Sequence, residues 1–213
     1  MKRIQIILLI AAVCVLLPTG CDDDHGTTVD APEIVFYSLQ DALNHRENAE
    51  ELRIWRMGDS LSPAIGLLTK VFFLGIYDSD LRYLPDEITN LHIGFLWLPN
   101  CKFQHIPPQI CALHGLGYLI LDGNEIETIP NEFKDLKYIS TLSLQNNKLE
   151  SFPRELFVTD HCRLLQLDSN RLTTFDFTRA DLPEINHLSL IGNPLPDSVK
   201  QRLKKEFGDK VHL

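Results

Sequence analysis

The 213-residue sequence has few basic residues for the number of its acidic ones. It contains 20 Lys and Arg against 29 Asp and Glu, which gives a formal net charge of −9. A protein that binds nucleic acid neutralises phosphates with Lys and Arg, and this chain has no excess of either. The composition therefore excludes nucleic acid as an expected partner. Low-complexity tracts are missing too, so the sequence is that of a folded chain.

Motifs that carry catalysis or metal binding are also missing. The eight histidines form no HExxH pattern, and no CxxC pair is present. Gly115 and Gly117 are not followed by a third glycine at 120, which a phosphate-binding loop would require. We therefore predict no catalytic residues, no metal site and no cofactor.

The one long apolar run lies at the start of the chain. Lys2 and Arg3 precede residues 4–17, which are apolar apart from Gln5. This run of about 14 residues is shorter than the roughly 20 that a helix needs to cross a bilayer. It indicates a signal peptide over residues 1–20 rather than a transmembrane helix. Cleavage there removes two positive charges and leaves a mature net charge of −11.

The sequence LPTGC at 17–21 resembles the lipobox of bacterial lipoproteins. Small Thr19 and Gly20 precede Cys21, while Pro18 departs from the aliphatic residue that the pattern usually has there. The resemblance implies that Cys21 receives a diacylglyceryl group and becomes the mature N-terminus. The prediction is a lipid-anchored protein, with a plainly secreted one as the alternative.

Residues 21–33 are predicted to form an acidic tether. Asp22, Asp23 and Asp24 directly follow Cys21. Acidic runs at this place resemble surface-export signals of Bacteroidetes lipoproteins, whereas a single Asp resembles the enterobacterial signal for inner-membrane retention. We expect a location in the bacterial cell envelope, and we favour the outer membrane or cell surface over the inner membrane.

Beyond residue 48 the sequence repeats every 22 or 23 residues. One apolar column comprises Ile76, Leu98, Leu121, Leu144, Leu167 and Leu190. A second column, two positions earlier, comprises Leu74, Leu96, Leu119, Leu142, Leu165 and Leu188. Three positions after the first column stand Ser79, Cys101, Asn124, Asn147, Asn170 and Asn193. Proline occurs once per unit in four units, as Pro85, Pro107, Pro130 and Pro153. A period held over about 125 residues indicates a repeat protein.

These columns resemble the leucine-rich repeat family in its 23-residue form, LxxLxLxxNxLxxLPxxIxxLxxL. The predicted fold class is an α/β solenoid, a horseshoe whose Leu-x-Leu segments pair into a parallel concave sheet. We place one degenerate unit, five full units and a final partial unit in residues 49–195. Ser79 and Cys101 form fewer hydrogen bonds than Asn, so we expect less tightly fixed turns there. Asp176 takes the proline place in the fifth unit, which predicts an irregular convex segment.

Both ends of the array carry predicted caps. Residues 34–48 contain a helix start at Ser38 with Asp41 three residues later, and apolar residues on one helix face. Residues 196–213 contain a helix with Val199 and Leu203 on its apolar face, which Gly208 ends. With both ends sealed we expect no appended catalytic domain, and hence a non-enzymatic protein.

Three cysteines remain besides Cys21 in the mature chain, namely Cys101, Cys111 and Cys162. Cys101 and Cys162 stand in core-facing columns two units apart, too distant to bridge. We predict buried free thiols, with a disulfide or a reactive thiol as the alternative.

Outward positions on the first strands are rich in aromatic residues, whereas those on later strands are small or polar. The predicted partner-binding residues are Trp55, Phe73, Tyr77, Phe95, Trp97, Tyr118 and Asp122. Exposed aromatic groups rimmed by charges are typical of binding hot spots, which favours a protein or peptide partner. The alternatives are rings that only stack on one another, a second copy of the chain, a glycan ligand, or an injected effector whose N-terminus is misread as a signal.

Overall fold

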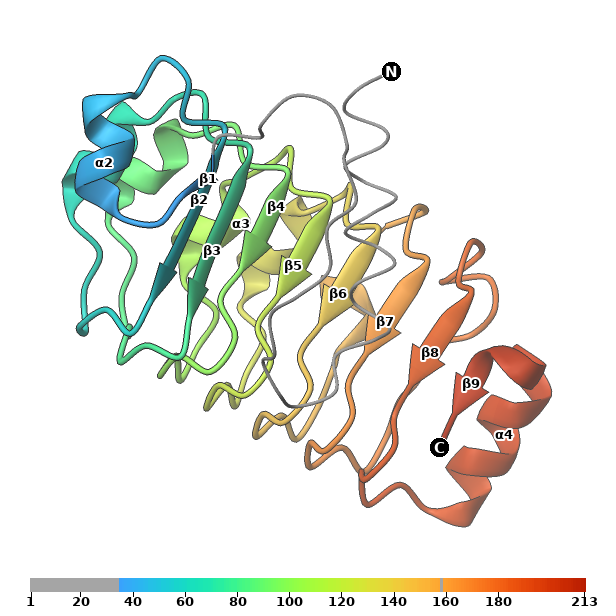
Figure 1. The fold of residues 1–213 in the computed structure, drawn as a ribbon. Helices are drawn as coiled ribbons and strands as arrows, with labels where there is room; N and C mark the ends of the chain where they lie inside the picture. The colour runs from blue at the N-terminus through green and yellow to red at the C-terminus, as the bar shows by residue number, and fades with distance from the viewer. Residues whose placement is uncertain (1–34, 158) are drawn as a thin grey trace, which may run out of the picture. The chain divides into compact units, whose positions relative to one another are not determined.

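The structure is a computed structural model that describes residues 35–157 and 159–213. The predicted signal peptide, Cys21 and the whole predicted tether lie outside the described residues. Within the described part, nine parallel strands form one sheet in chain order (Figure 1). The strands are β1 (Val35–Phe36), β2 (Glu51–Trp55), β3 (Phe73–Tyr77), β4 (Phe95–Trp97), β5 (Tyr118–Ile120), β6 (Thr141–Ser143), β7 (Leu164–Gln166), β8 (His187–Ser189) and β9 (Val211–His212).

The register places equivalent residues of successive units side by side. Leu96 pairs with Leu74 and Leu119, and the same column continues through Leu142 to Leu188. The leucines of this column are fully buried, because alternation along each strand turns them away from the open face. The degenerate unit provides β2, whose five residues all pair with β3. The predicted parallel solenoid is confirmed.

Short helical segments line the convex side, behind the strands in Figure 1. They are η1 (Pro63–Leu67), η2 (Asp86–Asn90), α3 (Pro108–Cys111), η3 (Asn131–Asp135) and η4 (Arg154–Leu156). Each of the last four begins directly after one of the column prolines, whose fixed φ suits the residue before a helical turn. Residues 167–186 contain no helix, and buried Phe175 and Phe177 stack there at 4.6 Å between ring centroids. The fifth convex segment is therefore irregular, as predicted.

A ladder of buried asparagine amides links the turns that follow the strands. The Asn147 Nδ2 donates to the carbonyls of Leu121 (2.9 Å) and Leu144 (3.1 Å), and its Oδ1 accepts from the Ile126 amide at 3.0 Å. Asn124, Asn170 and Asn193 repeat this pattern one unit apart. Each amide thus satisfies backbone groups of two neighbouring units, which an apolar residue could not do.

The ladder is weaker in the first units. Ser79 accepts one bond, from the Met57 amide, and donates one, to the Tyr77 carbonyl. The Cys101 thiol makes two contacts of 3.7 Å, with the backbone carbonyls of Ile76 and Pro99. The smaller bonding capacity expected at these two positions is therefore observed.

A residue with a left-handed backbone conformation, that is with positive φ, directly precedes each member of this ladder. The non-glycine residues with positive φ are Arg56, Asp78, Asn100, Asn146 and Ser169, and Gly123 and Gly192 continue the same column. At Gly123 φ is +67°, a conformation that glycine adopts without the strain that a side chain brings. The strands therefore end in a sharp turn at the same level in every unit.

Helices close the two ends of the described solenoid (Figure 1). Helix α2 (Leu39–Asn44) begins after Ser38, whose Oγ accepts from the Asp41 amide and donates to the Asp41 carboxylate. It is shorter than the predicted cap, because β1 occupies the start of that segment. Helix α4 (Asp197–Phe207) begins after Pro196 and ends at Gly208 with φ of +59°. A turn, η5 (Gly208–Lys210), then leads into β9.

The asparagine ladder generates the first prediction. Asn147→Ala removes four hydrogen bonds and leaves buried backbone groups without partners, so we expect it to lower the free energy of unfolding by about 2 to 4 kcal/mol. The neighbouring Lys148→Ala removes only a half-exposed pair with Glu125, at 2.8 Å, and should cost less than about 1 kcal/mol. Urea unfolding of the two variants measures both values, and similar costs would contradict the ladder's role.

Candidate functional site

The open face of the sheet carries three rows of side chains that run across the strands. The first row comprises Glu51, Phe73, Phe95, Tyr118, Thr141, Leu164 and His187. The second row comprises Arg53, Gly75, Trp97, Ile120, Ser143, Gln166 and Ser189. The third row, at the carboxyl ends of the strands, comprises Trp55, Tyr77, Pro99, Asp122, Gln145, Asp168 and Ile191.

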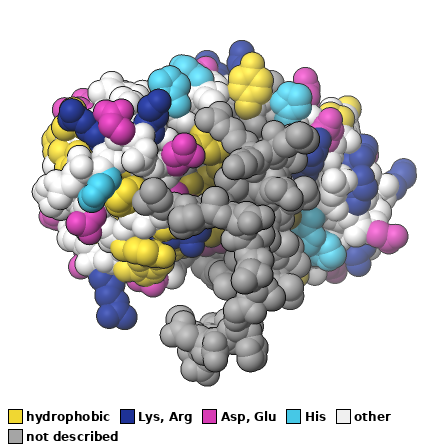
Figure 2. Space-filling view, turned by 45° about the horizontal axis from the view of Figure 1, so that its top comes forward, with side chains coloured by type: hydrophobic (Ala, Val, Ile, Leu, Met, Phe, Trp, Pro, Cys, Tyr) yellow, Lys and Arg dark blue, Asp and Glu magenta, His cyan; other side chains and the backbone are white. Residues whose placement is uncertain are grey.

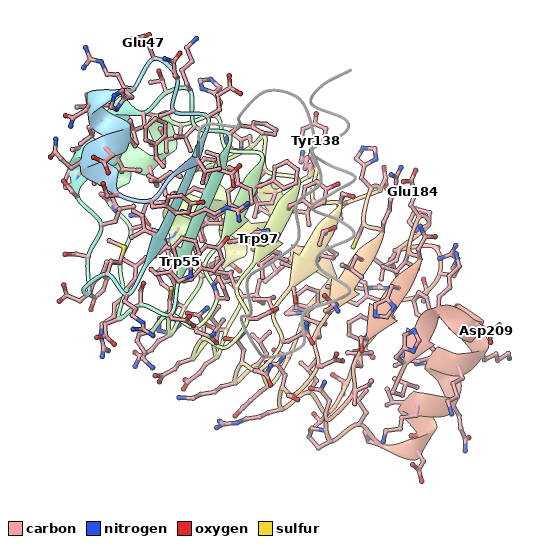
Figure 3. All side chains as sticks on the ribbon, in the orientation of Figure 1. Glu47, Trp55, Trp97, Tyr138, Glu184 and Asp209 are labelled. Atoms are coloured by element: carbon pink, nitrogen blue, oxygen red, sulfur yellow. The ribbon has the colours of Figure 1, made fainter. Side chains whose placement is uncertain are left out.

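Four aromatic residues at the N-terminal end of this face form one continuous group, which we call the aromatic surface. Its members are Tyr37, Trp55, Tyr77 and Trp97. Ring centroids lie 5.9 Å apart for Tyr37 and Trp55, 4.8 Å for Trp55 and Tyr77, and 6.4 Å for Tyr77 and Trp97. Tyr37 is 65% exposed and Trp55 is 45% exposed, while the other two are half-buried. Figure 3 shows both tryptophans on the first half of the sheet.

Tyr37 was not among the predicted binding residues. It lies between β1 and the Ser38 cap, outside the repeat register, so no column assigns a direction to its side chain. The only signal in the sequence is an aromatic residue next to a helix N-cap. The contact with Trp55 places it on the aromatic surface.

Two predicted binding residues, Phe73 and Phe95, do not offer the exposed rings that the alternation implied. They are 4% and 1% exposed. Their rings stack at 6.2 Å, and Phe72 packs its edge on Phe95 at 5.5 Å. Trp97 also meets Phe73 edge-on at 5.2 Å. These two phenylalanines therefore support the neighbouring rings and present little surface of their own.

Tyr118 continues the first row beside them. Its ring stacks on Phe95 with a centroid distance of 4.2 Å and an interplanar angle of 18°, and the residue is half-buried. Offset stacking of this kind stabilises neighbouring rings beyond the area they bury. One face of the Tyr118 ring is consequently occupied by the protein itself.

The Tyr77 ring lies over the backbone of Gly75 in the same strand. A Cβ added to Gly75 would come within 2.6 Å of the ring carbon Cε2 of Tyr77. Glycine is required here because the ring occupies the space of a side chain. The ring is thereby held between those of Trp55 and Trp97.

Trp97 carries a buried donor. Its indole Nε1 has no hydrogen-bond partner among the described residues. Native structures leave few buried donors unsatisfied, because each costs free energy.

Charge on the N-terminal half of this face is balanced. The Arg53 guanidinium pairs with the Glu51 carboxylate and lies over the Phe73 ring, 5.0 Å from its centroid. The cation therefore has a carboxylate and a ring face as partners. This arrangement leaves the first strands dominated by aromatic surface rather than by net charge.

Two carboxylates on the C-terminal half, those of Asp122 and Asp168, accept the same pattern of hydrogen bonds. The Asp122 Oδ1 accepts from the Ser143 hydroxyl (2.6 Å) and the Gln145 amide (2.9 Å). The Asp168 Oδ1 accepts from the Ser189 hydroxyl (2.5 Å) and the Ile191 amide (2.7 Å). In each case a side chain and a backbone group of the next unit orient the carboxylate.

Burial raises the pKa of Asp122 to about 6. The hydrogen bonds from Ser143 and Gln145 oppose this shift, because they favour the charged form, and the nearby charge of Asp168 adds to it. Asp122 was predicted as part of the binding surface, and it lies next to Ile120 at the junction of the aromatic and polar halves.

The three cysteines in the described part are unpaired and buried, which confirms the prediction of free thiols. Burial raises the pKa of Cys101, Cys111 and Cys162 to about 12. Such thiols stay protonated at neutral pH, and the thiolate is the nucleophile. The alternatives of a disulfide or a reactive thiol therefore receive no support from these positions.

Histidines on the open face meet at the C-terminal end. His187 and His212 have ring centroids 4.5 Å apart, and burial together with His212 lowers the pKa of His187.

Among the described residues no group of three or more metal-ligating side chains has the arrangement of a metal site. None of the described helices is long and apolar enough to cross a membrane.

The raised pKa of Asp122 generates the second prediction. Between about pH 4 and 6 the folded state binds a proton that the unfolded state releases, so Asp122 lowers stability as the pH rises through this window. In Asp122→Asn the amide oxygen keeps both hydrogen bonds, and the buried charge is gone. The difference in free energy of unfolding between this variant and wild type should therefore increase, in favour of the variant, by on the order of 1 to 2 kcal/mol as the pH rises from 4 to 7. Urea unfolding at both pH values tests this, and a pH-independent difference would contradict it.

Figure 2 shows the surface around this site. Hydrophobic, acidic and basic side chains are interspersed on the visible surface, and Lys and Arg side chains occur at both ends of it.

Comparison with solved structures identifies the fold. An internalin from Listeria monocytogenes matches with a TM-score of 0.62 and 16% identity, covering 83% of this chain and 57% of the internalin chain. The leucine-rich repeat ectodomain of the receptor kinase GASSHO1/SCHENGEN3 from Arabidopsis thaliana matches with a TM-score of 0.59 and 24% identity. That match covers 76% of this chain and 20% of the ectodomain.

No family model and no curated protein matches the sequence. At identities this low the structural matches establish the fold and nothing finer. Together with the nine-stranded parallel sheet of the described residues, they show that this chain has the leucine-rich repeat fold.

Proposed function

We propose that this protein is a non-enzymatic, lipid-anchored leucine-rich repeat protein of the bacterial cell envelope. Its concave face binds a protein or peptide partner through the aromatic surface. The leucine-rich repeat fold typically serves as a binding scaffold, which supports the general class of function. The arrangement of Tyr37, Trp55, Tyr77 and Trp97 supports the place of binding.

The observation that carries this proposal is the exposed contact of Tyr37 with Trp55. Exposed rings that touch one another form an apolar patch, which costs free energy in water and invites association. Large aromatic side chains are also enriched among the few residues that dominate binding energy at interfaces. A partner that covers the aromatic surface removes the cost and gains from the same rings.

The ring geometry favours a protein partner over a glycan. Sugars stack on open aromatic faces, but Trp55 and Tyr77 stack on each other with an interplanar angle of 17°. Tyr118 and Phe95 likewise share their faces. The most accessible rings are those of Tyr37 and Trp55, which contact each other and suit apolar and carbonyl groups of a polypeptide.

Support for the partner class also comes from one of the structural matches. The crystal structure of the plant ectodomain contains it in complex with CASPARIAN STRIP INTEGRITY FACTOR 2. That protein therefore uses the leucine-rich repeat fold to hold a partner. For the present chain this supports binding as the kind of activity.

The anchor rests on the sequence around Cys21. If Cys21 carries the lipid, Cys21→Ser should move the protein from the membrane fraction to the soluble fraction, because a single acidic tether has no other affinity for lipid. Cell fractionation and the intact mass of the mature N-terminus provide the measurements. A wild-type chain that is soluble and has no acyl mass would refute the anchor, and Asp24→Asn serves as a nearby control that should stay on the membrane.

Partner capture tests the aromatic surface. Crosslinking in intact cells followed by mass spectrometry identifies the partner, which is then titrated against purified variants. Trp55→Ala should weaken binding by about thirtyfold, since burial of a large ring at an interface contributes about 2 kcal/mol. Tyr83→Ala removes a ring that is more exposed than Trp55 and stands on neither β2 nor β3, and it should leave affinity unchanged.

Both variants are expected to keep the melting temperature of wild type within a few degrees, because each side chain faces solvent. Full affinity of Trp55→Ala for the captured partner would remove the aromatic surface from the proposed function. Binding to a polysaccharide array, with no protein captured from cells, would favour the glycan alternative.

A further inference from the structure

The third row of the open face contains a regular series of interaction groups. Tyr77, Asp122 and Asp168 stand in this row, with one unit between each and the next. Neighbouring strands are about 4.8 Å apart, so the intervals from Tyr77 to Asp122 and from Asp122 to Asp168 are each about 9.6 Å. One aromatic group and two carboxylates therefore lie in one row across the strands.

The two carboxylates have no cationic partner in the described part of the chain. Neither Asp122 nor Asp168 forms an ion pair there, and the three rows contain no Lys or Arg besides Arg53. Arg53 already pairs with Glu51. This half of the face therefore carries uncompensated negative charge, which is complementary to a cationic ligand.

Hydrogen bonds from the next unit along the sheet fix the orientation of both carboxylates. Asp168 accepts at Oδ1 from the Ser189 hydroxyl and the Ile191 backbone amide. Asp122 accepts at Oδ1 from the Ser143 hydroxyl and the Gln145 backbone amide, and the Gln145 side chain also hydrogen-bonds to this carboxylate. A Lys or Arg side chain that approaches either group thus finds a preorganised acceptor and loses little affinity to reorganisation.

The interval of about 9.6 Å selects the conformation of a peptide that follows the row. Polyproline II rises about 3.1 Å per residue with three residues per turn, so every third residue faces the same side at intervals of about 9.3 Å. In an extended β-strand, residues on one side recur at about 6.6 or 13 Å, which matches neither interval. Aromatic-lined grooves also bind proline-rich segments in this conformation, because the peptide is already ordered before it binds.

We infer that the polypeptide bound by the concave face, in the function proposed above, is a basic proline-rich segment in the polyproline II conformation. It crosses the strands along the third row. An apolar residue rests against Trp55 and Tyr77, and basic side chains three residues apart meet Asp122 and Asp168. The inference deepens the proposed function and depends on it.

Titration of four fluorescent peptides against the full-length protein, at one salt concentration and pH 7.5, tests this by fluorescence anisotropy. The peptide (Pro-Pro-Lys)₄ has a Lys on every turn of a polyproline II helix. The peptide (Pro-Pro-Pro-Pro-Lys-Lys)₂ has the same composition with adjacent lysines. The peptide (Gly-Ser-Lys)₄ keeps the charge spacing on a flexible chain, and (Pro-Pro-Glu)₄ reverses the charge.

We expect (Pro-Pro-Lys)₄ to bind at least tenfold more tightly than each of the other three peptides. Equal binding of (Gly-Ser-Lys)₄ would show that charge alone is recognised and would overturn the inference. Equal binding of the peptide with adjacent lysines would show that the spacing of the lysines does not matter, which would overturn the inferred match between the polyproline II repeat and the spacing of Asp122 and Asp168. Failure of (Pro-Pro-Lys)₄ to bind would also overturn it.

Variants locate the binding. Asp168→Asn should weaken (Pro-Pro-Lys)₄ at least fivefold, because the amide keeps the bonds from Ser189 and Ile191 but loses the charge. Asp176→Asn is the matched control, since Asp176 is a mostly exposed carboxylate of the irregular convex segment and should leave affinity unchanged. Equal effects of the two variants would place the peptide elsewhere and contradict the inference.

Failure of the inference is distinguishable from failure of the proposed function. A partner captured from cells whose binding depends on Trp55, combined with no selective binding of (Pro-Pro-Lys)₄, rejects the inference alone. If the captured partner binds Trp55→Ala with full affinity, the proposed function is rejected, whether or not the peptides bind selectively.

Discussion

The structure depends on one recurring interaction, the hydrogen bonds of a buried amide with backbone groups of two successive units. In leucine-rich repeats no unit buries its apolar residues alone, so the fold exists only if neighbours stay in register. The amide of Asn147 enforces this register, because it accepts from the Ile126 amide and donates to the carbonyls of Leu121 and Leu144. Hydrophobic burial drives the stacking, and the polar bonds fix how the stack is aligned.

That alignment explains why a face made of separate short strands acts as one surface. Each strand contributes one side chain to a row, and neighbouring side chains in a row come from different units. The Trp55 ring touches Tyr77 because their strands pair residue by residue. Asp122 and Asp168 adopt the same hydrogen bonds because the same local geometry recurs two units later. The repeat register therefore fixes the positions on this face, and the side chains that occupy those positions determine what the surface can bind.

Much of this architecture was predictable from the sequence. The period of 22 or 23 residues located β2 to β8, since it reports backbone geometry directly. The helical turns that begin after the column prolines were not predicted from the sequence. The exposure of Phe73 and Phe95 was not predictable. Alternation gives the direction of a side chain, but the rings of Phe72, Trp97 and Tyr118 that cover these two residues depend on rotamers.

Other features of the candidate site lay outside what a repeat pattern reports. Tyr37 belongs to no column, so only the folded chain brings it to Trp55. The shared bonding of Asp122 and Asp168 needed the position of a serine in the following unit, which is a contact between units rather than a property of either. By contrast, the free thiols of Cys101 and Cys162 followed from the columns alone, because core-facing positions two units apart cannot meet.

The weak part of the asparagine ladder has a consequence for how the molecule responds to a ligand. Ser79 and Cys101 link the first units with fewer bonds, and end units of a solenoid have a neighbour on one side only, so local opening there requires the least free energy. Trp55 and Tyr77 stand on those same units. A ligand that spans both rings ties together the segments that open first, so occupancy at this end and resistance of the N-terminal units to proteases and hydrogen exchange rise together.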